Sequence, residues 1–191
     1  MVILASQSPR RKQLLEWAEI SFEIIVQNTD EIFPPELSLK NIPVHIAKQK
    51  AFAVKHYLET ENKLIEFPIL AADTIVVLKD KIIGKPKNRE DAIEILHSLS
   101  AKKHKVITGV VILHQKKEIV FSDVTEVIFH ALPSSQIEYY VDKYKPYDKA
   151  GAYAIQEWIG VVGIKEIKGD FYNVMGLPIS RVVKALKQIE N

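Results

Sequence analysis

Charged side chains of two kinds stand at positions where they could do chemistry together: Arg10, Arg11, Glu31, Lys50, Asp73 and Lys85. Cations of fixed geometry bind polyphosphates, and carboxylates bind a divalent cation and activate water. This combination is the equipment for metal-assisted attack on a phosphoanhydride. The phosphate-loop pattern GxxxxGK[ST] is missing from the sequence, which excludes a P-loop NTPase.

The two arginines follow a predicted helix start in "LASQSPRRKQLL". Ser8 is a good N-cap, and Pro9 suits the first helical position. A helix N-terminus already carries about half a positive charge, so Arg10 and Arg11 have the wrong sign for stability there. An anion bound by the backbone N–H groups and the guanidinium groups would remove this mismatch, which favours a phosphate site. The alternative is a solvated pair of surface arginines.

Asp73 lies among apolar residues in "PILAADTIVVL". Carboxylates are rarely buried without a partner, because an ionised group loses solvation there. Asp73 is therefore either a structural residue that accepts backbone N–H bonds at a strand bend, or a general base or metal ligand that faces a cleft. Thr74 faces the other way in a regular strand, so the strand must bend or bulge if both residues serve one site.

Three further charged residues are weaker candidates taken singly. Lys50 lies on or beside the apolar stripe of a predicted helix, where it either extends to the edge or faces a phosphate. Lys85 stands between a glycine and a proline in "IIGKPKNREDA", a loop that restricts its backbone, although surface lysines are common. Glu31 follows a strand end in "NTDEIFPP", where an isolated acidic residue is usually only solvated.

The elements that must position these residues alternate along the chain. We expect strands over 2–5 and 22–27, helices over 9–19 and 43–58, and a strand that turns at Lys79-Asp80 and returns within 68–86. We expect further helices over 88–99 (capped by Asn88), 134–144 (capped by Ser134 or Ser135) and 178–189, and antiparallel β segments over 105–114 and 118–131. The segment 147–177 is expected to be irregular. The interleaving favours an α/β fold with a mixed, twisted sheet and flanking helices.

Composition sets the broad class. The chain has 191 residues, no cysteine, six scattered histidines and a formal net charge of +2, which gives no reason to expect nucleic-acid or membrane binding. The opening "MVILASQSPRR" does not resemble a signal peptide, and no stretch approaches the roughly 20 apolar residues of a membrane span. We therefore expect a cytoplasmic protein whose residues 1–191 form one functional domain, or two small lobes.

Eight motifs in order carry a resemblance to a known family. They are "LASQSPRR", "TDE", "AKQKA", "AADTIVV", "GKPKNREDA", "HKVITGVV", "DKAGAYAIQ" and "GDFYNVMGLPI", from Leu4 to Ile179. The chain thereby resembles the Maf-like nucleoside triphosphate pyrophosphatases. The resemblance implies two lobes around a deep cleft, a shape related to the inosine triphosphate pyrophosphatases. It also implies release of pyrophosphate from a nucleoside triphosphate with a divalent metal, Mg²⁺ or Mn²⁺, and relatives that commonly form homodimers.

The resemblance also assigns roles to individual residues. Ser6, Arg10 and Arg11 match the triphosphate site. Glu31, Lys50 and Lys85 match the other charged active-site positions, and Asp73 matches the proton acceptor. Glu31 and Asp73 are the expected metal ligands. The combination of Arg10, Thr74 and Gln156 resembles the subfamily that acts on dTTP and UTP. A neutral Gln offers a donor and an acceptor, which suits the edge of uracil or thymine. The alternatives are the same reaction on 7-methyl-GTP or another modified nucleotide, and a non-catalytic nucleotide-binding regulator of cell division.

Overall fold

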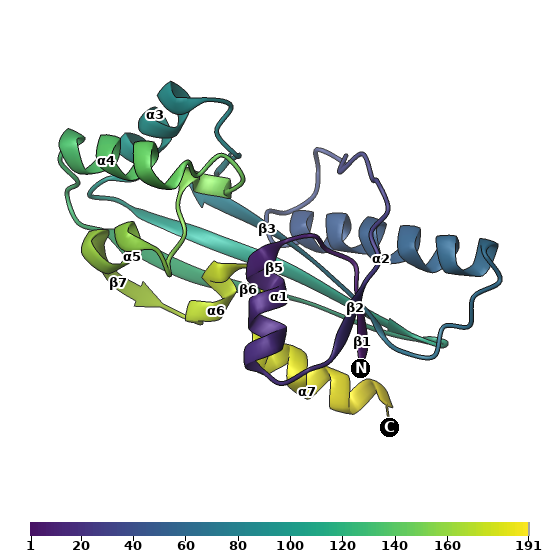
Figure 1. The fold of residues 1–191 in the computed structure, drawn as a ribbon. Helices are drawn as coiled ribbons and strands as arrows, with labels where there is room; N and C mark the ends of the chain where they lie inside the picture. The colour runs from purple at the N-terminus through teal and green to yellow at the C-terminus, as the bar shows by residue number, and fades with distance from the viewer. Residues whose placement is uncertain (191) are drawn as a thin grey trace. The chain divides into compact units, whose positions relative to one another are not determined.

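The computed structural model describes residues 1–190 and has the mixed α/β architecture that the sequence predicts (Figure 1). The strands are β1 (Val2–Leu4), β2 (Phe22–Ile24), β3 (Ile69–Leu78), β4 (Lys81–Ile83), β5 (Lys103–His114), β6 (Lys117–Phe129) and β7 (Ile164–Lys168). The helices are α1 (Pro9–Trp17), α2 (Ile42–Thr60), α3 (Arg89–Leu99), α4 (Ser134–Tyr144), α5 (Trp158–Gly163), α6 (Phe171–Met175) and α7 (Ile179–Glu190), with a short 3₁₀ helix at Ala150–Ala152. No helix within residues 1–190 combines the length and the apolar character that crossing a membrane requires.

A seven-stranded mixed sheet forms the framework, in the order β2-β1-β3-β5-β6-β7, with β4 paired only to β3. β1 runs parallel to both β2 and β3, whereas β4 is antiparallel to β3 and β7 is antiparallel to β6. β5 and β6 are neighbours joined by two residues, a connection that only antiparallel strands allow. The expected antiparallel pair is therefore confirmed.

The chain divides into two compact units. The first comprises Met1–Asp73, Thr108–Asp123 and the chain from Gly176 onward, and the second comprises Thr74–Ile107 and Val124–Met175. β3, β5 and β6 each contribute residues to both units. Asp73 and Thr74, neighbours in the sequence, therefore belong to different units.

The core of the first unit lies between α2 and the sheet. Side chains at helical spacing on α2 and side chains of the strands form one buried cluster: Ala47, Ala51, Val54, Leu58, Ile3, Ile69, Ala71, Val111 and Leu113. A Cβ at Gly109 would lie 2.2 Å from the backbone nitrogen of Val44, so only glycine lets the start of α2 approach β5. This close approach brings α2, and with it Lys50, against the sheet.

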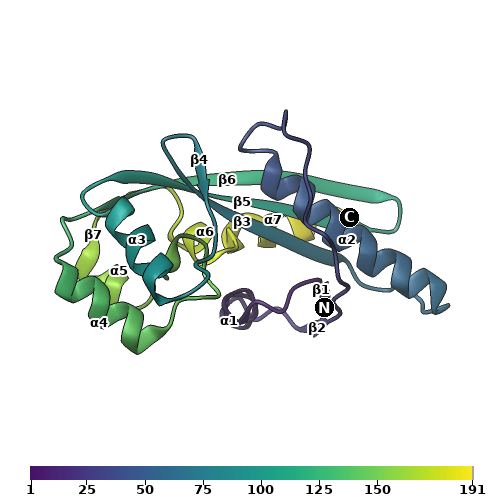
Figure 2. The ribbon, with the colours of Figure 1, turned by 90° about the horizontal axis from the view of Figure 1, so that it is seen from above.

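In the second unit, α3 and α4 lie side by side (Figures 1 and 2). Arg89 of α3 donates two hydrogen bonds to Asp142 of α4, of 2.6 and 2.9 Å, while the apolar face of α4 is buried. In the same unit His104, Phe129 and Tyr153 pack as an aromatic cluster with ring centroids 5.0–5.4 Å apart. Aromatic packing of this kind fixes the start of the segment that carries Gln156.

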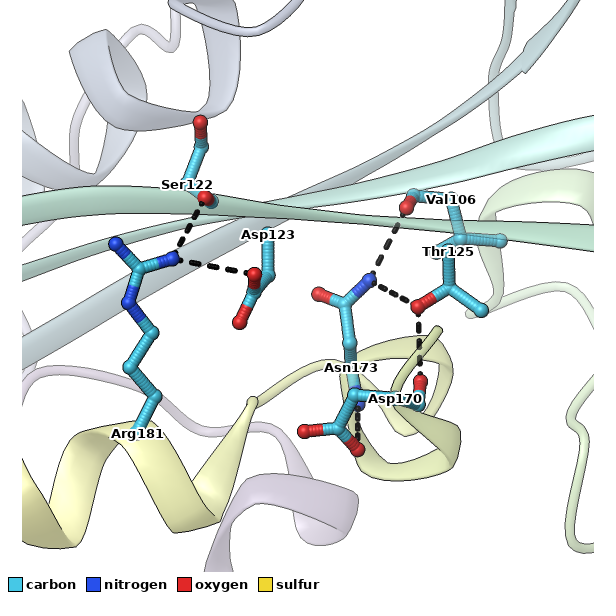
Figure 3. Close-up of polar contacts among 7 residues, drawn as sticks. All are labelled: Val106, Ser122, Asp123, Thr125, Asp170, Asn173 and Arg181. Atoms are coloured by element: carbon cyan, nitrogen blue, oxygen red, sulfur yellow. Dashed lines mark hydrogen bonds and ion pairs between the residues drawn. The ribbon is translucent and has the colours of Figure 1, made fainter. Parts of the chain in front are cut away.

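A buried polar network holds α6 in the second unit (Figure 3). Asn173 is fully buried, and its side-chain nitrogen donates to the Val106 carbonyl at 3.1 Å and to the Thr125 hydroxyl at 3.0 Å. Thr125 in turn donates to the Asp170 carbonyl at 2.9 Å, and Asp170 accepts from the N–H of Tyr172 at 2.7 Å. These bonds explain the polar residues of "GDFYNVMGLPI" as structural ones.

Helix α7 is attached to β6 in the first unit by Lys117, which donates to the Ile189 carbonyl at 3.3 Å, and by Arg181. Arg181 donates 3.1 Å hydrogen bonds to the Ser122 carbonyl and to Asp123 (Figure 3). Its guanidinium also lies 4.2 Å from the ring centroid of Phe121, a cation–π contact. Arg181 is the third residue of α7, two positions after Ile179 of the "LPI" motif, and no pattern in the sequence signals either contact.

Most local predictions are confirmed, because they depend on neighbouring residues. Asn88 accepts a 2.9 Å hydrogen bond from the Asp91 N–H as the N-cap of α3. Lys79 and Asp80 both adopt positive φ, 48° and 64°, in the turn between β3 and β4, as a two-residue hairpin loop requires.

Three local predictions need correction. Pro133, and not Ser134 or Ser135, is the N-cap of α4, so no side-chain cap bond forms. The segment 147–177 is not irregular throughout, since it contains β7, the short helices α5 and α6, and the 3₁₀ helix. The expected strand over 22–27 ends at Ile24. β7 was missed because its five residues gain their regular structure from pairing with β6 rather than from a local pattern.

Candidate active site

The loop between β1 and α1 is closed by a serine. Ser6 Oγ accepts the Ser8 N–H at 3.2 Å and Arg11 Nη1 at 3.0 Å, and Ser6 is buried. Ser8 occupies the N-cap of α1 but makes no side-chain cap bond. The predicted helix start is therefore confirmed, while the hydroxyl that organises it belongs to Ser6.

Arg11 is the more deeply placed of the two arginines. It is 8% exposed, and its Nε donates to the Gly176 carbonyl at 2.9 Å. Burial lowers the pKa of its guanidinium, the charges of Asp73 and Glu31 oppose this effect, and Arg10 adds to it. Arg10, one residue earlier, is half-buried. The alternative of two solvated arginines is wrong for Arg11, which is part of the framework of the first unit.

Lys50 joins the two predicted carboxylates. Its Nζ lies 2.7 Å from Glu31 Oε1 and 2.7 Å from Asp73 Oδ1. The side chains of Lys50 and Asp73 are only 18% and 14% exposed, whereas Glu31 is 50% exposed. Lys50 comes from α2, Asp73 from β3 and Glu31 from the loop before α2, so three separate segments of the first unit meet here.

The loop that carries Glu31 has a special backbone. Glu31 adopts a φ of 52°, in the left-handed region that side-chain-bearing residues rarely occupy. Gln49 Nε2 on α2 donates to the carbonyl of the next residue, Ile32, at 2.8 Å. Strained residues of this kind occur at functional sites, where the surrounding structure holds them in place.

The Glu31 and Asp73 carboxylates fit a divalent cation that is bound jointly by the protein and by substrate phosphates. No group of three or more His, Cys, Asp or Glu that could hold a metal exists within the described residues 1–190. Mg²⁺ and Mn²⁺ suit carboxylate oxygens, and Mg²⁺ is usually held by one or two carboxylates together with substrate phosphates. The Glu31–Asp73 pair therefore fits a cation that arrives with its nucleotide, and not a resident metal held by protein ligands alone.

The second unit carries the other predicted residues: Thr74, Lys85 and Gln156. Thr74 is half-buried in β3, and Lys85 is exposed in the loop after β4. The carbonyl of Gly84 in this loop accepts the Gly151 N–H at 3.1 Å, and Gly151 has a φ of 74°. The loop with Lys85 is thereby bonded to the segment that leads to Gln156.

Gln156 has the most informative environment of these three. It is half-buried, and its Oε1 is out of contact with solvent and accepts no hydrogen bond from residues 1–190. The sequence prediction missed a polar network next to it, in which Tyr140 and Lys149 are buried and Glu157 is half-buried. The sequence signals for this network are a tyrosine on the apolar face of α4 and the charged residues on either side of "AGAYAIQ".

Comparison with known proteins shows the family. The family model described as "Maf-like protein" matches residues 1–189, and the chain belongs to this family. A "dTTP/UTP pyrophosphatase" of Cytophaga hutchinsonii is 50% identical, with 100% of this chain and 84% of the relative aligned. Proteins of the same name from Parabacteroides distasonis (97% of this chain, 94% of the relative) and Bacteroides thetaiotaomicron (98% and 95%) are 47% and 44% identical.

Proposed function

We propose that this chain is a nucleoside triphosphate pyrophosphatase that converts dTTP and UTP to the monophosphate and pyrophosphate. The observation that carries the proposal is the Lys50 ammonium held at 2.7 Å from both Glu31 and Asp73. Such an array combines a base for water with ligands for a cation, which binding alone does not need. The names of the relatives support the two pyrimidine substrates. On this proposal residues 1–191 act as one catalytic domain.

The triphosphate end uses the cations and the helix start. Ser6, Arg10 and Arg11 stand at the N-terminus of α1, where backbone N–H groups favour an anion. The hydrogen bond that Arg11 Nη1 donates to Ser6 Oγ fixes the orientation of the guanidinium before substrate arrives. Lys85 supplies a further positive charge for the phosphates from the loop after β4.

Asp73 is the proposed general base. It accepts a proton from water as the water attacks phosphorus, and the bridge between the α- and β-phosphates breaks with pyrophosphate as the leaving group. Lys50 holds the Asp73 carboxylate in one orientation through its 2.7 Å hydrogen bond. Glu31 and Asp73 would hold Mg²⁺ or Mn²⁺, which supplies positive charge to the phosphate oxygens.

The base end depends on Gln156, with Thr74 and Arg10 as further proposed base-selecting residues. The buried Oε1 of Gln156 is an acceptor for the ring N–H of uracil or thymine, and its Nε2 is a donor for a neighbouring carbonyl. A site that hydrogen-bonds a polar edge rejects a mismatched base strongly, because its own buried groups are then left unsatisfied.

The test is pyrophosphate release from a panel of dTTP, UTP, 7-methyl-GTP, GTP and ATP, with Mg²⁺ or Mn²⁺ added. We expect pyrophosphate from dTTP and UTP, and we expect Asp73→Asn to remove it while the protein stays folded. Asp80→Asn in the hairpin turn is the matched control, because it makes the same chemical change at an exposed position. Preferred turnover of 7-methyl-GTP, or binding of nucleotide without pyrophosphate release, would reject the assignment.

We also propose a cytoplasmic location, no nucleic-acid partner and a homodimer. The near-neutral charge and the character of the substrates support the first two. Sedimentation of the purified protein measures the third.

A further inference from the structure

We propose that Tyr140 is a positioning residue for base recognition, because its hydroxyl ties together the two ends of the turn that presents Gln156. This inference rests on the function proposed above, in which Gln156 reads uracil or thymine. In this proposal Tyr140 contacts neither the base nor the phosphates, but it determines how firmly the Gln156 side-chain amide is held.

The turn consists of Ala154, Ile155, Gln156 and Glu157. The Glu157 N–H donates to the Ala154 carbonyl at 3.1 Å, so Gln156 is the third residue of a hydrogen-bonded turn. The Tyr140 hydroxyl accepts the Ala154 N–H at 3.2 Å and donates to the Glu157 carboxylate. One hydroxyl thus bonds to the residues at both ends of the turn.

Tyr140 and the Glu157 carboxylate that accepts its hydrogen bond are both held in place. Tyr140 is fully buried on α4, and burial together with its bond to Glu157 raises the pKa of its hydroxyl, which therefore remains a donor. The other oxygen of Glu157 lies 3.5 Å from Lys149 Nζ, and Lys149 is 8% exposed and bonded to Asp148 at 2.7 Å. The carboxylate is thus held by one neutral donor and one cation.

The backbone of the turn is also closely packed on its other side. A Cβ at Gly160 would lie 1.8 Å from the Ile155 carbonyl oxygen, so α5 contacts the turn without any side chain between them. The Gly160 N–H donates to the Glu157 carbonyl at 2.9 Å. The turn therefore cannot move toward α5, and Tyr140 closes it from α4.

These contacts matter for Gln156 because its Oε1 is buried and accepts no hydrogen bond from the described part of the chain. A buried acceptor without a donor is suited to an N–H group of a ligand. Holding that acceptor in place before binding lowers the entropy lost when the base arrives. Loosening the turn should therefore weaken binding of the base end and leave the phosphate end unchanged.

The experiment compares Tyr140→Phe with Tyr144→Phe. Tyr144 stacks on Tyr140 one helical turn away, so its variant loses a hydroxyl from the same helix without touching the turn. We expect Tyr140→Phe to raise KM for UTP about five- to tenfold, with kcat within about twofold, since hydrogen bonds at the turn are lost but the chemistry is not. Inhibition by inorganic tripolyphosphate, which has no base, should be unchanged, and Tyr144→Phe should match the wild type.

A double-mutant cycle separates positioning from general damage. In a Gln156→Ala background, Tyr140→Phe should raise KM no further, because no reading amide is left to position. An equal KM effect with and without Gln156, or a matching loss of tripolyphosphate affinity, would overturn the inference. Glu157→Ala removes the same hydrogen bond from the other partner, so it provides the same test if Tyr140→Phe folds poorly.

Failure of the inference is distinguishable from failure of the proposed function. A wild-type protein that releases no pyrophosphate from UTP rejects both. A wild-type protein that does release it, with Tyr140→Phe no different from Tyr144→Phe, rejects the inference alone.

Discussion

Lys50 forms two ion pairs of equal length, and we predict that their contributions to the unfolding free energy differ. Replacing Lys50 with Met removes both pairs and allows each contribution to be measured. Lys50 Nζ lies 2.7 Å from both Asp73 and Glu31, but Asp73 is 14% exposed and Glu31 is 50% exposed. A hydrogen bond to a charged group held mostly away from water contributes about 1.5–3 kcal/mol, whereas an exposed ion pair contributes about 0.2–1 kcal/mol. The coupling of Lys50 to Asp73 should therefore exceed its coupling to Glu31 by about 0.5–3 kcal/mol.

Two double-mutant cycles measure these couplings. One combines Lys50→Met with Asp73→Asn and the other combines it with Glu31→Gln, and each variant is unfolded in urea at low and at high salt. Salt should reduce the Glu31 coupling more, because screening acts mainly on exposed charges. Equal couplings, or a larger one for Glu31, would show that burial does not decide the strength of this array.

Two further predictions concern the stability of the fold. Burial lowers the pKa of His104 to about 4 from its usual 6.5, so the unfolded chain binds a proton that the folded one excludes. The contribution of neutral His104 to the unfolding free energy is then complete above about pH 6.5, and about 3 kcal/mol of it is lost as the pH drops to about 4. His104→Gln should lose about 3 kcal/mol less than the wild type over this pH range. Parallel pH profiles of the two proteins in urea unfolding would contradict this. Arg11→Ala should cost about 2–4 kcal/mol of unfolding free energy, because it removes hydrogen bonds to Gly176 and Ser6 that are buried. Lys12→Ala on the same helix is the control, and equal costs for the two variants would show that Arg11 has no structural role.

The sequence by itself determined the features that depend on neighbouring residues. The N-cap of α3 needs only Asn88 and Asp91, three residues apart, and the β3–β4 turn needs only Lys79 and Asp80. Cap and turn bonds close over a few residues, so a local pattern specifies them. The ordered motifs likewise indicated the family, because they preserve the residue types that the site needs.

Only the tertiary structure decided which of those residues meet and how they are held. Arg11 donates to the carbonyl of Gly176, 165 residues away, and Lys50 meets Asp73 across 23 residues. β7 exists because its backbone pairs with β6, and Tyr140 on α4 donates and accepts hydrogen bonds at the turn that carries Gln156. Contacts of this kind join groups that are distant in the chain, and a backbone carbonyl or a buried hydroxyl accepts whichever donor folding brings to it. The sequence therefore named most of the candidate residues, and packing fixed their partners.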